Sequence, residues 1–89
     1  MRTVYKYPVA FDRPTVMMPV GATVRCVGTQ DGWNVVVWAE VDTDHDLMEP
    51  RQFYIFGTGH PIPDGLAYVG TVICNQGTLI WHVYTEPTG

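Results

Sequence analysis

A histidine lies among glycines and prolines in segment 57–63, which reads Gly-Thr-Gly-His-Pro-Ile-Pro. Glycine reaches backbone angles that other residues avoid, and proline stiffens the chain. Such a loop can therefore offer backbone N–H groups and an imidazole to an anion or small ligand through Gly57, Thr58, Gly59 and His60. The same composition also suits a rigid corner with a purely geometric role. No phosphate-loop lysine or helical pattern follows the segment.

His82 is the second candidate for chemistry and stands in the apolar run 79–84. Strand alternation places it on the same face as Ile80 and Tyr84, where a histidine serves either as a hydrogen-bonded structural residue or as a binding residue. A zinc site that combines His60, His82 and a cysteine lacks the usual C-x-x-C or H-x-x-x-H spacing. The sequence therefore predicts neither a metal site nor a cofactor.

Acidic side chains alternate at Asp42, Asp44 and Asp46, as at the start of a calcium-binding EF-hand loop. The match then fails, because Leu47 stands where the turn needs glycine and a phenylalanine replaces the closing glutamate. We expect a solvated loop over residues 42–50.

Catalytic constellations are also weak. The chain has no serine, and both cysteines lie in apolar runs that predict burial, which makes a thiol a poor nucleophile. His60 or His82 could form an acid–base pair with Asp64 or Glu40, but no spacing requires it. We expect a protein that is not an enzyme.

The elements that position these residues are short β-strands. Glycine and proline punctuate runs rich in Val, Ile, Thr, Tyr and Trp, and no window has the periodicity of an amphipathic helix. The pattern predicts an all-β fold of about seven mostly antiparallel strands in a small sandwich or partly open barrel. The expected strands are 2–7, 15–18, 22–29, 33–41, 52–56, 66–74 and 78–84. Asp31-Gly32 predicts a hairpin turn, residues 75–77 predict a type I turn with a glycine bulge, and residues 86–89 are expected to fray.

The strand expected at 33–41 is apolar on both faces. Val35, Val37 and Ala39 point one way, and Val36 and Trp38 point the other. Such a strand is either central and covered twice, or has an exposed face that meets a partner chain. Aromatic side chains are candidate interface anchors, both in this strand and in the strand expected at 52–56: Trp33, Trp38 and Tyr54. The predicted core draws on Tyr5, Val24, Cys26, Val35, Val37, Phe53, Ile55, Val69, Leu79, Trp81 and Val83.

Composition limits the partners. The 89 residues carry a net charge of -4, and the five Lys and Arg residues are dispersed, which argues against nucleic-acid binding. No apolar run reaches the length of a membrane span, and no signal-peptide pattern opens the sequence. We therefore expect a cytoplasmic protein with two reduced, buried thiols, Cys26 and Cys74. Apolar residues make up 46% of the chain, which is more apolar surface than one small core readily hides. We therefore also expect a homo-oligomer.

Six segments together resemble a family of small proteins encoded by tailed bacteriophages and prophages. They are TVYKY at 3–7, MPVGA at 18–22, WAEVD at 38–42, GTGHPI at 57–62, YVGT at 68–71 and LIWHVY at 79–84. The most specific are GTGHPI and the WHV(Y/F) motif. The resemblance implies a phage origin and expression in the cytoplasm of a bacterial host, but no particular activity.

Two functional hypotheses follow. The first is a non-enzymatic interaction protein that binds a host protein or its own copies. The second is a small-ligand or anion-binding module that uses the loop 57–63, with His60 as its polar group.

Overall fold

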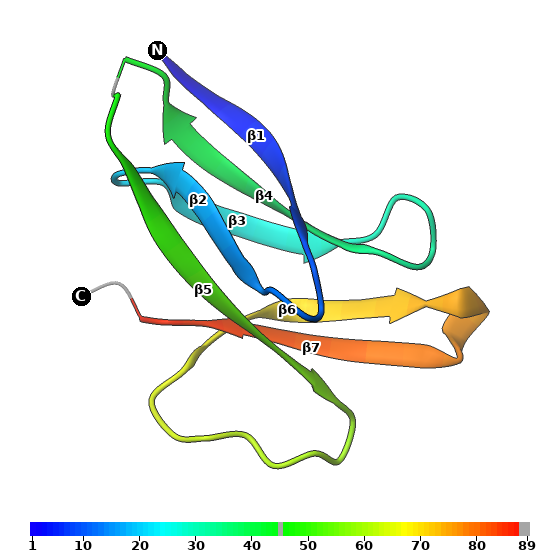
Figure 1. Cartoon of the computed structure of the whole chain (residues 1–89). Helices are drawn as coiled ribbons and strands as arrows, with labels where there is room; N and C mark the ends of the chain where they lie inside the picture. Colours follow the sequence, from blue (N-terminus) through cyan, green and yellow to red (C-terminus); the bar gives the residue numbers. More distant parts are fainter. Residues whose placement is uncertain (45, 88–89) are drawn as a thin grey trace.

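The computed structural model describes residues 1–44 and 46–87, and these form seven strands (Figure 1). The strands are β1 (Arg2–Val9), β2 (Thr15–Pro19), β3 (Thr23–Gly28), β4 (Val35–Asp42), β5 (Met48–Gly57), β6 (Ala67–Cys74) and β7 (Leu79–Thr85). A 3-10 turn, η1 (Asn75–Gly77), joins β6 to β7. Within the described residues, no helix is long and apolar enough to cross a membrane.

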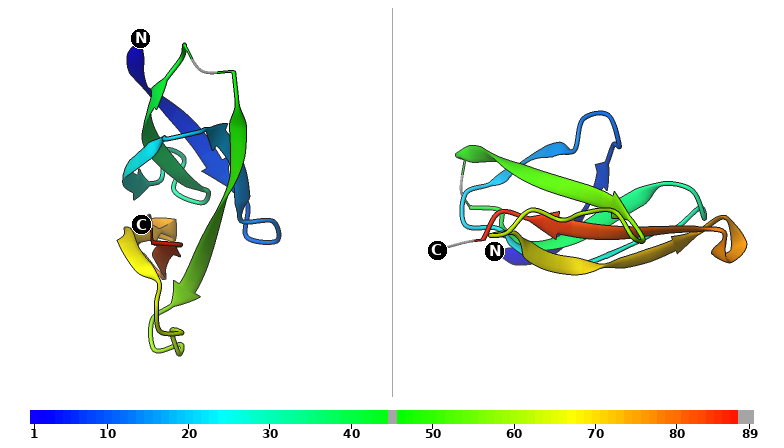
Figure 2. Two further views of the ribbon diagram at one scale, coloured as in Figure 1. Left: turned by 90° about the vertical axis from the view of Figure 1, so that its left-hand side faces the viewer. Right: turned by 90° about the horizontal axis from the view of Figure 1, so that it is seen from below.

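The strands form two antiparallel sheets that face each other without closing into a barrel (Figure 2). One sheet has the order β1-β4-β3, and the other has the order β2-β5-β7-β6. This arrangement confirms the predicted all-β fold with seven antiparallel strands. The core lies between the sheets, because each strand directs alternate side chains toward the other layer.

The predicted core is mostly correct. Val35, Val37, Phe53 and Val83 are fully buried between the sheets. Four further predicted residues are partly buried and pack against this cluster: Val24, Ile55, Val69 and Trp81. These side chains were found from strand alternation alone, which works where the ladder is regular.

Three core predictions are wrong: Tyr5, Cys26 and Leu79 are exposed. A bulge between Val24 and Cys26 shifts the register of β3, so Cys26 pairs with Trp38 on the outer face. Because a bulge adds one residue, it reverses the face of every residue after it. Cys26 is thus an exposed thiol, while Cys74 is buried as expected. Tyr5 lies on an edge strand and Leu79 next to a hairpin turn, where coverage by the opposite sheet ends.

The double apolar character of β4 is satisfied within the chain. Its inner face is fully buried, and Val36 on the outer face is only 7% exposed. Trp38 is half-buried and lies against Gly28, where a β-carbon would be 3.2 Å from Cζ3 of the indole. β4 is therefore central, as predicted, but within the described residues no second layer packs on its outer face, which is covered by side chains of its own sheet. The strand gives no support to a partner chain.

Two connections differ from expectation. The strand β5 begins at Met48 rather than residue 52, because β2 pairs along its first half from Thr15↔Gln52 to Pro19↔Met48. In the turn 75–77, all three residues have positive φ, including Asn75 at 49° and Gln76 at 54°, which differs from a type I turn. Of the tail expected to fray, residues 88–89 lie outside the described residues.

The connection from β3 to β4 is longer than the tight turn expected at Asp31-Gly32, because β3 ends at Gly28 and β4 begins at Val35. Trp33 therefore lies in this loop and not in the strand expected from residue 33, and Gly32 has φ 83°. The Asp31 carboxylate accepts hydrogen bonds from the backbone N–H groups of Trp33 and Asn34, at 2.9 and 2.8 Å. These bonds hold the pKa of Asp31 well below its ordinary value. The carboxylate thereby fixes a loop of six residues that presents Trp33 to solvent.

Candidate functional site

The site is built on the outer face of β5, β7 and β6, and the sheet order determines what covers it. β7 lies between β5 and β6, so the connection from β5 to β6 must cross β7. It crosses on the side away from the β1-β4-β3 sheet (Figures 1 and 2). The loop 57–63 therefore begins a strap over the outside of the sheet.

Six apolar side chains share this outer face. The register places Tyr54, Tyr84 and Tyr68 in one row across the three strands, and Ile80 opposite Ile73 in another. Phe56 lies on the same face of β5, two residues from Tyr54. We call this surface the outer aromatic face, and its members are Tyr54, Phe56, Tyr68, Ile73, Ile80 and Tyr84.

The aromatic rings contact one another edge to face. Tyr84 lies at the centre, with ring centroids 5.7 Å from Phe56 and 5.3 Å from Tyr68. The interplanar angles are 76° and 62°, a geometry that aligns a positive ring edge with a negative face. Each of these contacts packs a ring of a neighbouring strand against Tyr84.

A row of polar side chains separates the aromatic and aliphatic parts of this face. His82 Nε2 lies 2.8 Å from the hydroxyl of Thr58, and Nδ1 lies 3.0 Å from the hydroxyl of Thr71. The hydroxyl of Thr71 is in turn 2.6 Å from that of Tyr68. Both imidazole nitrogens are therefore occupied by hydroxyl partners. His82 ties the strap to the sheet and has no nitrogen left for a ligand.

His60 follows a tight turn at the start of the strap. Its backbone N–H donates to the carbonyl of Gly57 at 3.1 Å, so this group is used within the loop. A β-carbon at position 57 would lie 3.0 Å from Cε1 of His60, which explains the glycine there. Gly59 has φ 87°, a conformation that glycine adopts without strain. Local geometry therefore accounts for both glycines. The His60 side chain remains exposed.

Tyr54 is the polar end of the aromatic row. Its phenolic hydroxyl donates a hydrogen bond to the carboxylate of Glu86. That bond raises the pKa of Tyr54 above its ordinary value, because it stabilises the protonated phenol. The interaction connects β5 to the segment that follows β7.

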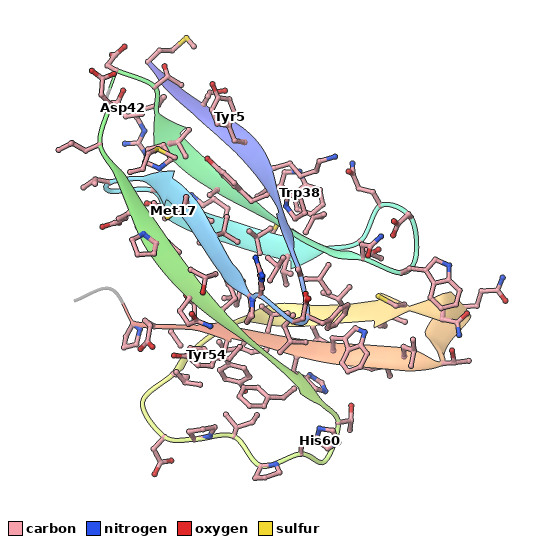
Figure 3. The ribbon with its side chains drawn as sticks, viewed as in Figure 1. Tyr5, Met17, Trp38, Asp42, Tyr54 and His60 are labelled. Carbon is pink, nitrogen blue, oxygen red and sulfur yellow. The ribbon has the colours of Figure 1, made fainter. Side chains whose placement is uncertain are left out.

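The structure brings together all but one of the predicted site residues. Gly57, Thr58, Gly59, His60, Tyr54 and His82 lie on β5, β7 or the strap between β5 and β6. Trp38 lies in the other sheet, away from Tyr54 and His60 (Figure 3). The sequence missed Phe56, Tyr68, Thr71 and Tyr84, although alternation from Tyr54 and His82 marks Phe56 and Tyr84. The turn expected at 75–77 already joins β6 and β7 as a hairpin, but the bulge between Tyr68 and Gly70, which places Tyr68 opposite Tyr84, does not follow from that turn.

No group of three His, Cys, Asp or Glu side chains suited to a metal ion occurs within residues 1–44 and 46–87. The acidic side chains Asp42 and Asp44 instead accept hydrogen bonds from the α-ammonium group of Met1.

A family model described as Domain of unknown function (DUF7352) matches residues 1–89. The chain belongs to this family. Searches of the curated proteins and of the solved structures found no match. The site of this DUF7352 chain is therefore interpreted from its own geometry.

Two of the hollows on the described surface of the DUF7352 fold border β6 or β7. One, of about 510 Å³, lies between β3 and β6 and is lined in part by Arg25, Arg51 and Tyr68. The other, of about 290 Å³, borders the start of the strap at Gly57 and Thr58 and continues over residues 78–81. The second is the only one of the two that reaches the predicted loop.

Proposed function

We propose that this protein is a non-enzymatic interaction protein that binds other polypeptides through the outer aromatic face. Its partner is either a host protein or another copy of the chain. The resemblance to phage proteins supports action in the cytoplasm of a bacterial host.

The observation that carries the proposal is the exposure of three apolar side chains of this face, Tyr68, Ile73 and Ile80, beside aromatic rings that are partly buried. Tyr68 is 59% exposed and Ile73 is 62% exposed, and both lie on β6. Aromatic side chains are enriched in protein interfaces, and contiguous exposed apolar surface marks interaction sites. The edge-to-face rings add rigidity, which lowers the entropy lost on binding.

The first experiment measures the solution mass of the purified protein by light scattering over a wide range of concentrations. Self-association gives a multiple of 10.0 kDa. In that case Ile73→Lys restores the monomer mass, because it places a charge in the apolar interface. Leu47→Lys is the matched control, since Leu47 is an equally exposed aliphatic residue outside the face.

A monomer under all conditions points to a different partner chain. A photocrosslinking amino acid at position 73 then captures that partner in bacterial cells, while the same group at position 47 does not. Equal crosslinking at both positions, or an oligomer unaffected by Ile73→Lys, would contradict the proposal.

The second candidate is a small-ligand site at the loop 57–63. The hollow of about 290 Å³ beside Gly57 and Thr58 favours it. Trp81 and Leu79 also line this hollow, so it suits a small molecule with an apolar body and one polar group. Titration with indole and with inorganic phosphate, followed by the NMR signals of Thr58 and Trp81, tests this candidate. A folded His60→Ala variant with unchanged responses would remove His60 from the site.

A further inference from the structure

The edges of the two sheets differ in how well they are protected. β3 and β6 are edge strands that lie side by side, and a β-carbon at Gly70 would be 2.7 Å from Cγ1 of Val27. Each is broken by an irregularity, between Val24 and Cys26 in β3 and between Tyr68 and Gly70 in β6. Bulges and mutual cover are common ways to stop an edge from pairing with another chain.

The third edge strand, β2, is protected by proline. It has five residues, follows Pro14 and ends at Pro19. Proline lacks the N–H that a ladder needs, so this edge offers little to a further strand.

The fourth edge strand, β1, is long and regular. Its eight residues pair with β4 without interruption, from Arg2↔Asp42 to Val9↔Val35. Pro8 stands near its end and has no N–H, so the open part of this edge is 2–7. Among the edges in the described part of the chain, only this one combines full length with an unbroken ladder.

The direction of its backbone groups follows from one hydrogen bond. The N–H of Thr43 donates to the carbonyl of Met1 at 2.9 Å, in continuation of the β1–β4 register. Hydrogen-bonded pairs alternate in an antiparallel ladder, so the odd-numbered residues of β1 bond to β4. Arg2, Val4 and Lys6 therefore direct their N–H groups to the open edge. Outside the ladder, no hydrogen bond to these three groups occurs within the described residues.

Both faces of β1 are open at the same point. Val4 on the outer face is 52% exposed, and Tyr5 on the inner face is 47% exposed. We propose that β1 accepts an extended segment of a partner protein as an additional antiparallel strand. This surface is separate from the outer aromatic face, and the proposal does not depend on it.

Charge identifies the occupant as an acidic segment. Arg2 and Lys6 flank Val4 on the same face of β1. Arg2 forms an ion pair with Glu40, but Glu40 also pairs with Arg25 at 3.1 Å. Lys6 donates to the side-chain amide of Gln30 at 2.6 Å, which carries no charge. Asp42 also stands on this face, opposite Arg2, but it accepts a hydrogen bond from the α-ammonium group of Met1. Lys6 is therefore the cation of this face whose contact is a neutral amide, and it favours a carboxylate on the added strand.

A second copy of β1 fits this edge poorly. The fully overlapped antiparallel pairing places Val4 opposite Val4 of the other copy. Arg2 of each copy then faces Lys6 of the other, and like charges directly opposite each other destabilise a sheet. The favoured segment instead has an apolar residue opposite Val4 and carboxylates two positions away on each side.

The test uses a synthetic peptide, Thr-Glu-Thr-Val-Thr-Glu-Thr, capped at both ends, and the isotope-labelled full chain. We expect the amides of Arg2, Val4 and Lys6 to shift in NMR spectra and to gain protection from hydrogen exchange. The same peptide with lysine in place of glutamate should bind at least roughly fivefold more weakly, because two opposite-charge pairs become like-charge pairs.

Two variants make the result specific. Val4→Pro removes an N–H that β4 does not use, so the protein folds but the peptide no longer protects the edge. Val4→Thr keeps the N–H and should bind normally.

Equal binding of both peptides, or unchanged binding to Val4→Pro, would overturn the proposal. Protection of these amides in a dimer without peptide would also overturn it, in favour of a second copy. Ile73→Lys should leave peptide binding intact, which separates this test from that of the outer aromatic face.

Discussion

The outer faces of the two sheets contrast in how their apolar residues are treated. In the β1-β4-β3 sheet, Val36 and Trp38 are covered by neighbours in their own sheet, and Gly28 provides the space for the indole. In the other sheet, Ile73 and Ile80 form a cross-strand pair with little cover, beside the aromatic row. The face that the sequence marks as strongly apolar is thus the better covered one.

The contrast shows that the exposure of a strand residue depends on its neighbours more than on its own strand. β4 is central, and on its outer face Val36 stands between Pro8 and Gly28, while Trp38 stands between Lys6 and Cys26. β7 is also central, but Tyr84 and Ile80 stand beside residues that are apolar themselves. Strand pattern alone cannot distinguish these situations, because cross-strand neighbours come from distant segments.

Among the tests of this contrast between the outer faces of the two sheets, Trp38→Ala should have the largest effect. Trp38 is half-buried over Gly28, so its truncation leaves a void and should lower the free energy of unfolding by about 2–3 kcal/mol. Trp33→Ala is the matched control, since Trp33 is 57% exposed on a loop and should cost less than about 1 kcal/mol. Urea unfolding measures both. Equal costs would mean that Trp38 is not covered as described.

Gly70→Ala tests the seam where the two sheets meet. The added β-carbon would lie 2.7 Å from Cγ1 of Val27, so β3 or β6 must shift. We expect a loss of about 1–2 kcal/mol in unfolding free energy. The double variant with Val27→Ala has space for the methyl group, and it should be more stable than the sum of the single effects predicts. Strict additivity would show that the seam is loose.

Acid should weaken the loop that presents Trp33, with a smaller effect. The hydrogen bonds to Asp31 lower its pKa, so the folded state favours the ionised carboxylate. The stability from this group is complete above the ordinary pKa of 3.8 and is lost as the pH falls through the lowered value. The difference in stability between the wild type and Asp31→Asn should therefore shrink as the pH falls below 3.8. Thermal unfolding as a function of pH measures it, and a constant difference would exclude this role.

Ile73→Thr should have the smallest effect on folding. The side chain is mostly exposed, and threonine retains the β-branching that suits a strand. We expect a change within about 0.5 kcal/mol. A clearly larger loss, measured by urea unfolding, would show that the outer aromatic face stabilises the fold rather than remaining available to a partner.

The sequence predicts the strands and most of the core, because alternation and turn residues are local signals. Val35, Phe53 and Val83 were identified in this way. It fails at Cys26, because a one-residue bulge reverses the face of the strand without any distinctive residue type.

The candidate site was predicted only in part. Thr58 and His82 were singled out separately, but their contact depends on the connection from β5 crossing β7. Thr71 joins them through the hairpin of β6 and β7, which the turn at 75–77 predicts, whereas Tyr68 reaches its place through the bulge in β6. The crossing of β7 by the connection from β5 arises from the order of strands in the sheet, which a single sequence does not specify.

The central position of β7 also affects how the protein is made. β5 and β6 leave the ribosome before β7, yet neither is hydrogen-bonded to the other in the finished sheet. Tyr54 pairs with Tyr84, which is synthesised thirty residues later, so the aromatic row cannot form before β7 is present. The aromatic residues of β5 are therefore unpaired for part of synthesis, and this sheet is completed only after β7 has emerged.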